Sequence, residues 1–276
     1  MRKVVCCLTS NNLYQTTNNF NMELAYREYG AGQPLIILHG LFGQSDNWNT
    51  LAKRFAEKGF RVFTLDQRNH GLSPHSDVWT YQSMAEDLKE FIEAHQLEKP
   101  IIIGHSMGGK TVMFFELLFP GIAKQLIVVD MAPRVYPPHH DAVLQALNAV
   151  DFTDINTRKD AEAILGTYIS DYGTKQFLLK NIYWREDESK QMAWRFNLEV
   201  ITKEYDHIGV AIPDGSSSIE TLFIRGSKSD YVTDEDQLDI ENHFPNYKLI
   251  TIADSGHWVH AEQPEAFFNA VLEFIQ

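Results

Sequence analysis

Short apolar runs alternate with amphipathic segments from Met22 onward, and this alternation organises most of the chain. The runs are rich in Ile, Leu, Val and Phe without polar interruptions, which is typical of strands buried on both faces of a sheet. Between the runs, apolar residues recur at helical spacing, as in Trp48, Leu51, Ala52 and Phe55. Strands and helices that take turns predict an α/β fold with a mostly parallel central sheet flanked by helices. Six strands are predicted at 35–38, 62–65, 101–103, 126–129, 222–224 and 249–252.

The alternation stops after Asp130 and resumes at about Ser218. The intervening residues contain helical stretches and a Trp-rich, charged segment, but no clear buried strand; the stretches are 142–150, 159–169 and 174–182. We therefore predict a helical cap at 134–213, inserted into one core domain formed by 22–133 and 214–276. Residues 1–21 are rich in Asn and Thr and have no apolar period, so a flexible N-terminal leader is expected there.

The strongest chemical signal is the pentapeptide Gly-His-Ser-Met-Gly at 104–108, which joins a predicted strand to a predicted helix. Glycines on both sides allow the sharp turn that exposes a serine hydroxyl at the edge of such a sheet. Ser106 is thus a candidate nucleophile; the alternative is a plain helix cap.

A second glycine-containing segment, His-Gly-Leu-Phe-Gly at 39–43, follows the first predicted strand. In this position a backbone N–H can contribute to an oxyanion hole, together with the N–H of the residue after the nucleophile. Leu41 and Met107 are the predicted donors, and a turn without function is the alternative. The segment 66–73, which also follows a strand, is expected to brace the site.

A serine nucleophile needs an imidazole base and an acid that orients it. His257 lies in the loop after the last predicted strand, which is the expected place for the base. Two carboxylates, Asp130 and Asp230, lie after strands on loops that can reach His257, and either could be the acid. The alternative role is a strand-end turn for Asp130 and a helix N-cap for Asp230. His257 and His260 lack a third ligand at metal-binding spacing, so no metal is expected.

Composition and charge narrow the class of protein. Lys and Arg number 24 and Asp and Glu 37, so the net charge of −13 gives no general reason to bind nucleic acid. The two cysteines, Cys6 and Cys7, are adjacent and cannot staple a fold, which favours a reducing compartment. No apolar run approaches the ~20 residues of a membrane span. We expect a cytoplasmic protein with a small-molecule substrate; the oligomeric state stays open.

With these residues assembled, the chain resembles the α/β-hydrolase superfamily of the alpha/beta-hydrolase-1 type, and more narrowly the YbfF-like esterase group. The motifs that carry the resemblance lie at 39–43, 68–74, 104–110, 194–197 and 256–262. The resemblance implies hydrolysis of carboxylic esters or acyl thioesters through an acyl-enzyme intermediate, without a cofactor. It also implies that Asp130 is the acid, because the position matching Asp230 is usually not acidic in that group.

The substrate pocket is predicted less sharply than the catalytic residues. The apolar side chains expected to line it are Phe42, Trp194, Phe196 and Trp258, although aromatic residues in a cap often serve packing instead. Three cations could meet an anionic head group: Lys110, Arg134 and Arg195. Two other functions stay open, a lyase or C–C hydrolase with the same triad and a hydrolase-fold receptor for a small ligand with little or no turnover.

Overall fold

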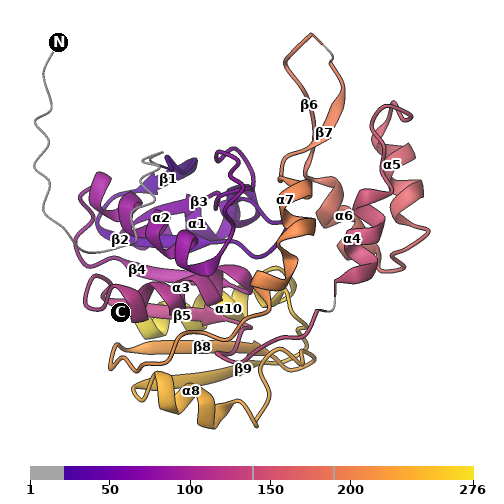
Figure 1. Ribbon diagram of the computed structural model, residues 1–276. Helices are drawn as coiled ribbons and strands as arrows, with labels where there is room; N and C mark the ends of the chain where they lie inside the picture. Colours follow the sequence, from indigo (N-terminus) through magenta and orange to yellow (C-terminus); the bar gives the residue numbers. More distant parts are fainter. Residues whose placement is uncertain (1–21, 139, 189) are drawn as a thin grey trace, which may run out of the picture.

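A seven-stranded sheet forms the centre of the computed structural model, which describes residues 22–138, 140–188 and 190–276 (Figure 1). The predicted leader at 1–21 lies outside the described residues. In spatial order the strands are β1 (Tyr26–Gly30), β3 (Phe60–Leu65), β2 (Gln33–Leu38), β4 (Ile101–His105), β5 (Gln125–Val129), β8 (Thr221–Gly226) and β9 (Tyr247–Ile252). Neighbouring strands are parallel except β1, which pairs antiparallel with β3. The mostly parallel α/β sheet is confirmed.

The strand β1 was not predicted, because it does not have the pattern of a buried strand. Its sequence is Tyr-Arg-Glu-Tyr-Gly, and four of its five residues are exposed at the edge of the sheet. Because most of its residues are exposed to solvent, their side chains do not have to be apolar.

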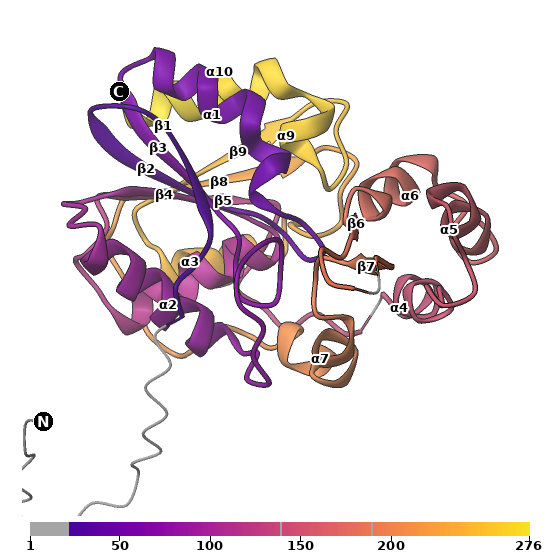
Figure 2. The same cartoon turned by 90° about the horizontal axis from the view of Figure 1, so that it is seen from above.

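Helices cover both faces of the sheet, as Figure 2 shows. On one face lie α1 (Asn49–Glu57) and α10 (Pro264–Ile275), and on the other lie α2 (Tyr81–Ala94) and α3 (Met107–Leu118). Because successive side chains of a strand point to opposite faces, Leu35 and Ile37 pack with α1 and α10, whereas Ile36 and Leu38 pack with α2 and α3. The continuous apolar runs in the sequence are thus explained by two cores that share one sheet.

The chain leaves this core after β5 and returns before β8, and the segment between forms the cap. Its elements are α4 (Asp141–Asn148), α5 (Arg158–Leu165), α6 (Tyr172–Leu179), β6 (Ile182–Trp184), β7 (Met192–Trp194), α7 (Leu198–Lys203) and η2 (Tyr205–Ile208). The first three helices overlap the predicted helical stretches. The expectation of no strand in the charged segment is wrong, because β6 and β7 pair as an antiparallel hairpin that projects from the molecule (Figure 1). Each of these strands has only three residues, too few for an alternating pattern to be recognised.

The two chain segments that join the cap to the core lie side by side. The Tyr136 N–H donates to the Gly209 carbonyl (2.7 Å), and the Ile212 N–H donates to the Pro133 carbonyl (3.0 Å). These bonds fix the entry and exit of the cap against each other near the carboxyl ends of β5 and β8. Within the described ranges, no helix is both long and apolar enough to cross a membrane.

Candidate active site

The turn between β4 and α3 places Ser106 in a strained backbone conformation. Its φ of 53° and ψ of −118° are unusual for a residue with a side chain. The glycines around it are required sterically: a Cβ on Gly104 would lie 2.2 Å from the Gly108 carbonyl oxygen, closer than any side chain can approach. The sharp strand-to-helix turn that the pentapeptide predicts is therefore present, with Ser106 at its apex.

A chain of hydrogen bonds connects Ser106 with His257 and Asp130. The Ser106 Oγ lies 2.9 Å from His257 Nε2, and His257 Nδ1 lies 2.7 Å from Asp130 Oδ2. An ionised carboxylate can only accept, so Nδ1 carries the proton and Nε2 is left to accept from the Ser106 hydroxyl. The structure brings together these three predicted residues from loops that are up to 151 positions apart in the sequence.

The Asp130 carboxylate is fully buried and is held by further donors. The Gly226 N–H donates to Oδ1 (3.1 Å), and the Ser229 hydroxyl donates to Oδ2. Burial raises the pKa of Asp130 to about 7, and the bonds from Ser229 and Gly226 oppose this rise. Sequence reasoning missed Ser229, since a serine in a loop after β8 gives no signal by itself.

The alternative acid, Asp230, lies elsewhere. It is exposed, and its backbone carbonyl accepts a hydrogen bond from the Arg134 guanidinium (3.3 Å). Its negative charge contributes to the raised pKa of Asp130. The structure thus brings Asp130, and not Asp230, into contact with His257.

The loop that carries His257 is fastened on both sides of the imidazole. The Glu262 carboxylate accepts from the N–H groups of Gly256 (2.8 Å) and Trp258 (3.2 Å). The ring of Tyr231 stacks on the imidazole with a centroid distance of 3.7 Å and an angle of 22°. Neither Glu262 nor Tyr231 was predicted as part of the site, because their roles depend on contacts between separate loops.

The segment 39–43 lies against Ser106. A Cβ on Gly40 would approach Ser106 Cβ to 3.1 Å and His105 Nδ1 to 2.9 Å, so only glycine allows the loop to come this close. The N–H groups of Leu41 and Met107, the predicted oxyanion donors, have no acceptor among residues 22–138, 140–188 and 190–276.

The neighbouring N–H of Phe42 is already occupied. It donates to His70 Nε2 (3.3 Å), while His70 Nδ1 lies 3.0 Å from the Arg68 carbonyl. Burial lowers the pKa of His70 to about 3, so the ring is neutral, donates from Nδ1 and accepts at Nε2. This arrangement favours Leu41 over Phe42 as the donor to an oxyanion.

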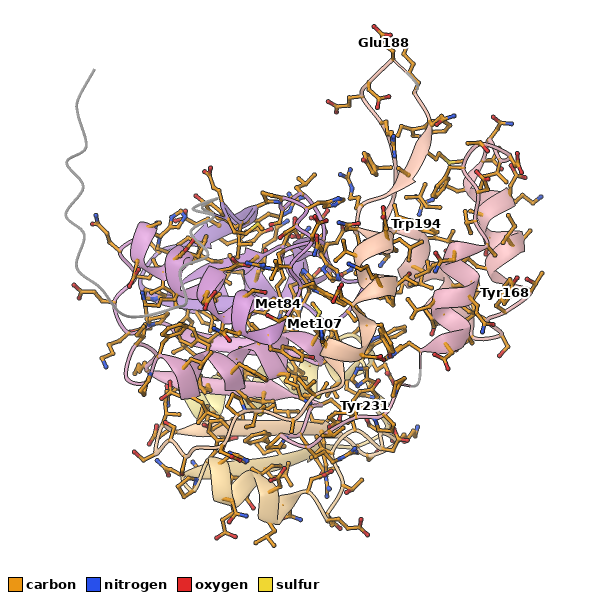
Figure 3. The ribbon with its side chains drawn as sticks, viewed as in Figure 1. Met84, Met107, Tyr168, Glu188, Trp194 and Tyr231 are labelled. Atoms are coloured by element: carbon orange, nitrogen blue, oxygen red, sulfur yellow. The ribbon has the colours of Figure 1, made fainter. Side chains whose placement is uncertain are left out.

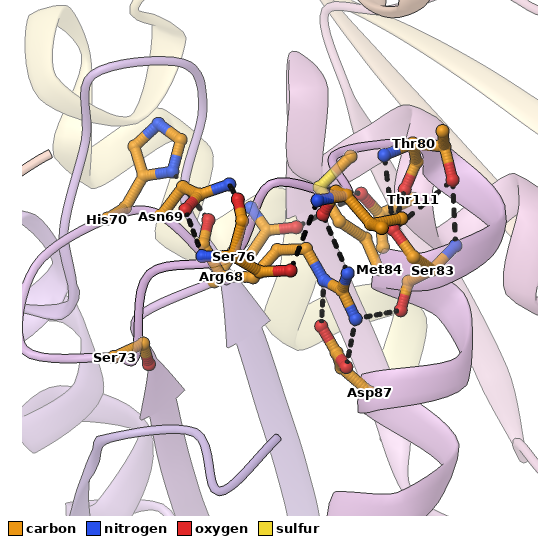
Figure 4. A network of polar contacts seen from close by, with 12 residues as sticks. Arg68, Asn69, His70, Ser73, Ser76, Thr80, Ser83, Met84, Asp87 and Thr111 are labelled. Carbon is orange, nitrogen blue, oxygen red and sulfur yellow. Dashed lines mark hydrogen bonds and ion pairs between the residues drawn. The ribbon is translucent and has the colours of Figure 1, made fainter. Parts of the chain in front are cut away.

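The loop after β3 braces the site from behind, as the sequence suggested. Gln67 donates its N–H to His39 Nε2 (3.0 Å), which positions the start of the segment 39–43. Arg68 forms two hydrogen bonds of 2.6 Å with the buried Asp87 carboxylate of α2 (Figure 4). Burial raises the pKa of Asp87 to about 6, and the guanidinium opposes this rise. This loop is therefore anchored to the helix layer through a buried ion pair.

Two hollows meet at Ser106. A cleft of about 720 Å³ opens between core and cap, and its lining includes Phe42, Phe177, His257 and Trp258. A much smaller compartment of about 40 Å³ lies toward the base of the cap, and its lining includes Tyr81, Met107, Met131, Tyr136 and Ile208. Ser106, Leu41, His140 and Tyr231 contribute to both hollows. Space therefore extends from Ser106 in two directions.

Comparison with known proteins identifies the family. The sequence profile described as alpha/beta hydrolase fold matches residues 33–264. The chain is an α/β hydrolase.

Similar proteins narrow the assignment within the hydrolases. The chain is 36% identical to Esterase YbfF of Escherichia coli (strain K12) over 258 residues, which cover 93% of this chain and 98% of the relative. It is 37% identical to the sn-1-specific diacylglycerol lipase ABHD11 of Danio rerio over 256 residues, covering 90% of this chain and 80% of the relative. Among solved structures, a marine microorganism esterase has 44% identity and a TM-score of 0.88, with 92% of this chain and 100% of that chain covered. The resemblance to the YbfF-like esterase group is confirmed.

The aromatic residues expected in the pocket of this hydrolase divide into two pairs. Phe42 and Trp258 line the cleft, but Trp194 and Phe196 line neither hollow and are buried in the cap. Trp194 stacks on Phe196 (5.4 Å between centroids, 11°), and Phe196 contacts Phe42 (5.1 Å). Figure 3 shows Trp194 on the hairpin side of the cap, away from Met107 and Tyr231. The pocket expectation is corrected for Trp194 and Phe196, which pack behind the wall that Phe42 forms.

The three cations considered for an anionic head group do not line the cleft either. Lys110 is fully buried, and its Nζ donates to the carbonyls of Arg134 (2.7 Å) and Val210 (2.6 Å). The Arg134 guanidinium pairs with Asp236 (2.7 Å), and that of Arg195 lies over the Tyr183 ring (4.6 Å). The hypothesis that these residues bind an anion is corrected: Lys110 ties together the two ends of the cap, and the arginines are engaged with other residues.

Proposed function

We propose that the protein hydrolyses carboxylic esters or acyl thioesters through an acyl-enzyme intermediate. The observation that carries this proposal is the continuous hydrogen-bond chain from Ser106 Oγ through His257 to the buried Asp130 carboxylate. Beside it lie two backbone N–H groups, of Leu41 and Met107, without acceptors among the described residues. A nucleophile, a base, an acid and an oxyanion hole are the parts that acyl transfer needs.

In the acylation step, His257 Nε2 takes the proton from Ser106 Oγ as the oxygen attacks the acyl carbonyl carbon. The carbonyl oxygen becomes negative and is held by the N–H groups of Leu41 and Met107. Asp130 stabilises the imidazolium by accepting from Nδ1. His257 then gives its proton to the leaving oxygen or sulfur, the bond between that atom and the acyl carbon breaks, and the acyl group remains as an ester on Ser106.

Deacylation repeats the same steps with water. His257 takes one proton from water as the water oxygen attacks the acyl carbon, and then returns a proton to Ser106 Oγ as that bond breaks. The carboxylic acid leaves and the free enzyme is restored. No redox step is involved, so this balance needs only substrate and water.

Two features favour ester or thioester cleavage over other reactions of the same fold. A serine at position 106 does not support the carboxylate nucleophile that opens epoxides or cleaves carbon–halogen bonds. The similar proteins include enzymes named esterase and lipase. A lyase or C–C hydrolase, and a receptor without turnover, remain the competing functions that the experiment has to separate.

The test is active-site labelling combined with turnover of p-nitrophenyl acetate. A fluorophosphonate probe should label Ser106, and Ser106→Ala should abolish labelling and lower kcat by as much as about 10⁶. The hydroxyls of Ser73 and Ser255, which donate to backbone carbonyls, serve as matched controls, and Ser73→Ala and Ser255→Ala should keep the label. Full activity of Ser106→Ala, or labelling at another serine, would contradict the proposal. Labelling without ester turnover would favour the receptor or the C–C hydrolase.

A further inference from the structure

The two hollows that meet at Ser106 differ in which catalytic group they expose. His257 and Trp258 line the large cleft and do not line the small compartment. Met107, whose N–H is assigned to the oxyanion hole, lines the compartment and not the cleft. Ser106 therefore faces two separate spaces: the cleft on the side of His257, and the compartment on the side of the Met107 N–H.

This difference between the two hollows indicates which one takes the leaving group of a substrate and which one takes its acyl chain. The leaving atom receives its proton from His257, so it must lie within hydrogen-bond reach of Nε2, on the side of the cleft. The acyl chain extends from the same carbonyl carbon in another direction, and the space available there is the compartment beside Met107. We propose that the substrates are esters or thioesters that join a short acyl group, of about two to four carbons, to a bulky leaving group. This inference rests on the proposed acyl-transfer function.

The size of the compartment sets the limit on the acyl group. An apolar cavity of about 150 Å³ holds one benzene ring, so about 40 Å³ suits an acyl group of only a few carbons. The walls are mostly apolar, with Met107, Met131 and Ile208 among them, which suits an alkyl chain.

One wall of the compartment is held in place by hydrogen bonds. Tyr81 donates its hydroxyl to the Ile208 carbonyl (3.0 Å), and Tyr136 donates its N–H to the Gly209 carbonyl (2.7 Å). A Cβ on Gly209 would lie 2.3 Å from the Tyr136 carbonyl oxygen, so the two segments are already in close contact. Lys110 holds the same two segments from the core side. An acyl chain that lengthens the compartment toward this wall would have to break these contacts.

The cleft, in contrast to the compartment, has room for a large leaving group. It is about 18 times larger than the compartment by the ratio of 720 to 40 Å³. Phe177 of α6 and Trp258 of the His257 loop contact each other at 5.0 Å and supply an apolar wall from both core and cap. A bulky alcohol or thiol can therefore bury apolar surface there without deforming the backbone.

The experiment compares two substrate series that each vary one half. In the first, p-nitrophenyl esters of acetate, butyrate, octanoate and laurate keep the leaving group constant. We expect kcat/KM to fall at least about tenfold between butyrate and octanoate. In the second, alkyl acetates from ethyl to octyl keep the acyl group constant, and kcat/KM should rise, by up to about fourfold per methylene buried.

Two matched variants test the assignment of each hollow. Ile208→Ala removes side-chain atoms from the compartment but keeps the carbonyl that accepts from Tyr81, so it should raise the octanoate-to-butyrate ratio at least about fivefold. Phe177→Ala enlarges the cleft and should weaken the dependence on alcohol length while it leaves the acyl profile unchanged. If Ile208→Ala does not fold, Met131→Ala probes the same compartment.

The possible outcomes separate this inference from the proposed function. Faster turnover of laurate than of butyrate, or an acyl profile that responds to Phe177→Ala and not to Ile208→Ala, would overturn the short-acyl assignment while ester hydrolysis stands. Absence of turnover in both series together with absence of fluorophosphonate labelling would overturn the proposed function itself.

Discussion

Replacing Asp130 by Asn tests the assignment of the acid while it preserves the shape of the side chain. The carboxylate accepts three hydrogen bonds, from His257 Nδ1 and Ser229 Oγ at Oδ2 and from the Gly226 N–H at Oδ1. An amide has one oxygen and one NH₂, so it cannot accept at both positions. With the NH₂ at Oδ2 it faces the imidazole, and with the NH₂ at Oδ1 it faces the Gly226 N–H.

Either orientation of the amide costs activity. The first favours the wrong tautomer, with the proton on Nε2, where the base must accept from Ser106. The second orientation places the amide NH₂ opposite the Gly226 N–H, so two donors face each other at 3.1 Å. In both orientations the negative charge that stabilises the imidazolium is lost. The same change in the serine-protease triad lowers kcat by about 10⁴, which corresponds to about 5 kcal/mol in the activation barrier. We expect a loss of this order.

Asp230→Asn is the matched control, because Asp230 is an exposed carboxylate 100 residues further along the chain. Its carbonyl, which accepts from Arg134, is kept, so kcat should stay within about tenfold, or about 1.4 kcal/mol. The assay is turnover of p-nitrophenyl acetate at about pH 8, with active sites counted by fluorophosphonate titration and folding checked by thermal unfolding. If Asp130→Asn keeps more than a tenth of the wild-type kcat, or if only the double variant is inactive, the assignment of a single acid is wrong.

Three further predictions follow from the contacts around the site. Ser229→Ala removes a donor that lowers the pKa of Asp130, so the acid limb of the kcat/KM profile should move to higher pH; an unchanged limb would contradict this. Burial lowers the pKa of Lys110 to about 7, so between pH 7 and about 10 the unfolded state binds more protons than the folded state. The free energy of unfolding of the wild type, measured in urea, should therefore rise relative to that of Lys110→Met as the pH rises across that interval. Trp194→Ala should lower the free energy of unfolding by about 3 kcal/mol and leave the octanoate-to-butyrate ratio unchanged, because Trp194 packs on Phe196 and lines no hollow.

The sequence was sufficient to predict the sheet where strands are buried on both faces. All six predicted runs lie within strands. Five of these strands are buried between two helix layers and have to be apolar on both sides, and the sixth, β9, lies at an edge and is only partly buried. The same reasoning failed where a strand is mostly exposed and polar, or where it is short. The edge strand β1 is mostly exposed, and the hairpin of β6 and β7 has three residues in each strand.

The site divides in a similar way. Ser106, Asp130 and His257 could be found because each directly follows a strand or lies in the loop after one, and because their residue types fit one reaction. Ser229 and Tyr231 could not, since neither forms a motif and both act only through contacts with Asp130 and His257. Trp194 was assigned to the pocket because residue type alone does not separate an aromatic wall from the packing behind it.

The register of the sheet explains why two of the three residues in the hydrogen-bond chain are fixed by the core itself. His105 of β4 pairs with Val129 of β5, so the next residues, Ser106 and Asp130, leave adjacent parallel strands at the same level. Both have a positive φ, 53° and 52°, and the sheet holds them through bonds from Ser106 N–H to the Val129 carbonyl (3.0 Å) and from Asp130 N–H to the Ile224 carbonyl (2.7 Å).

His257 lies beyond the end of β9 in a loop, and its backbone carbonyl accepts a hydrogen bond from His105 Nε2 of β4 (2.9 Å). Its position depends on Glu262, which binds the N–H groups on both sides of it, and on the stacked ring of Tyr231. Tyr231 also lines both hollows, and its backbone carbonyl accepts a hydrogen bond from the Tyr136 hydroxyl. The geometry of the His257 imidazole is therefore coupled to the same segments that line the small compartment, whereas the positions of Ser106 and Asp130 are set by the sheet.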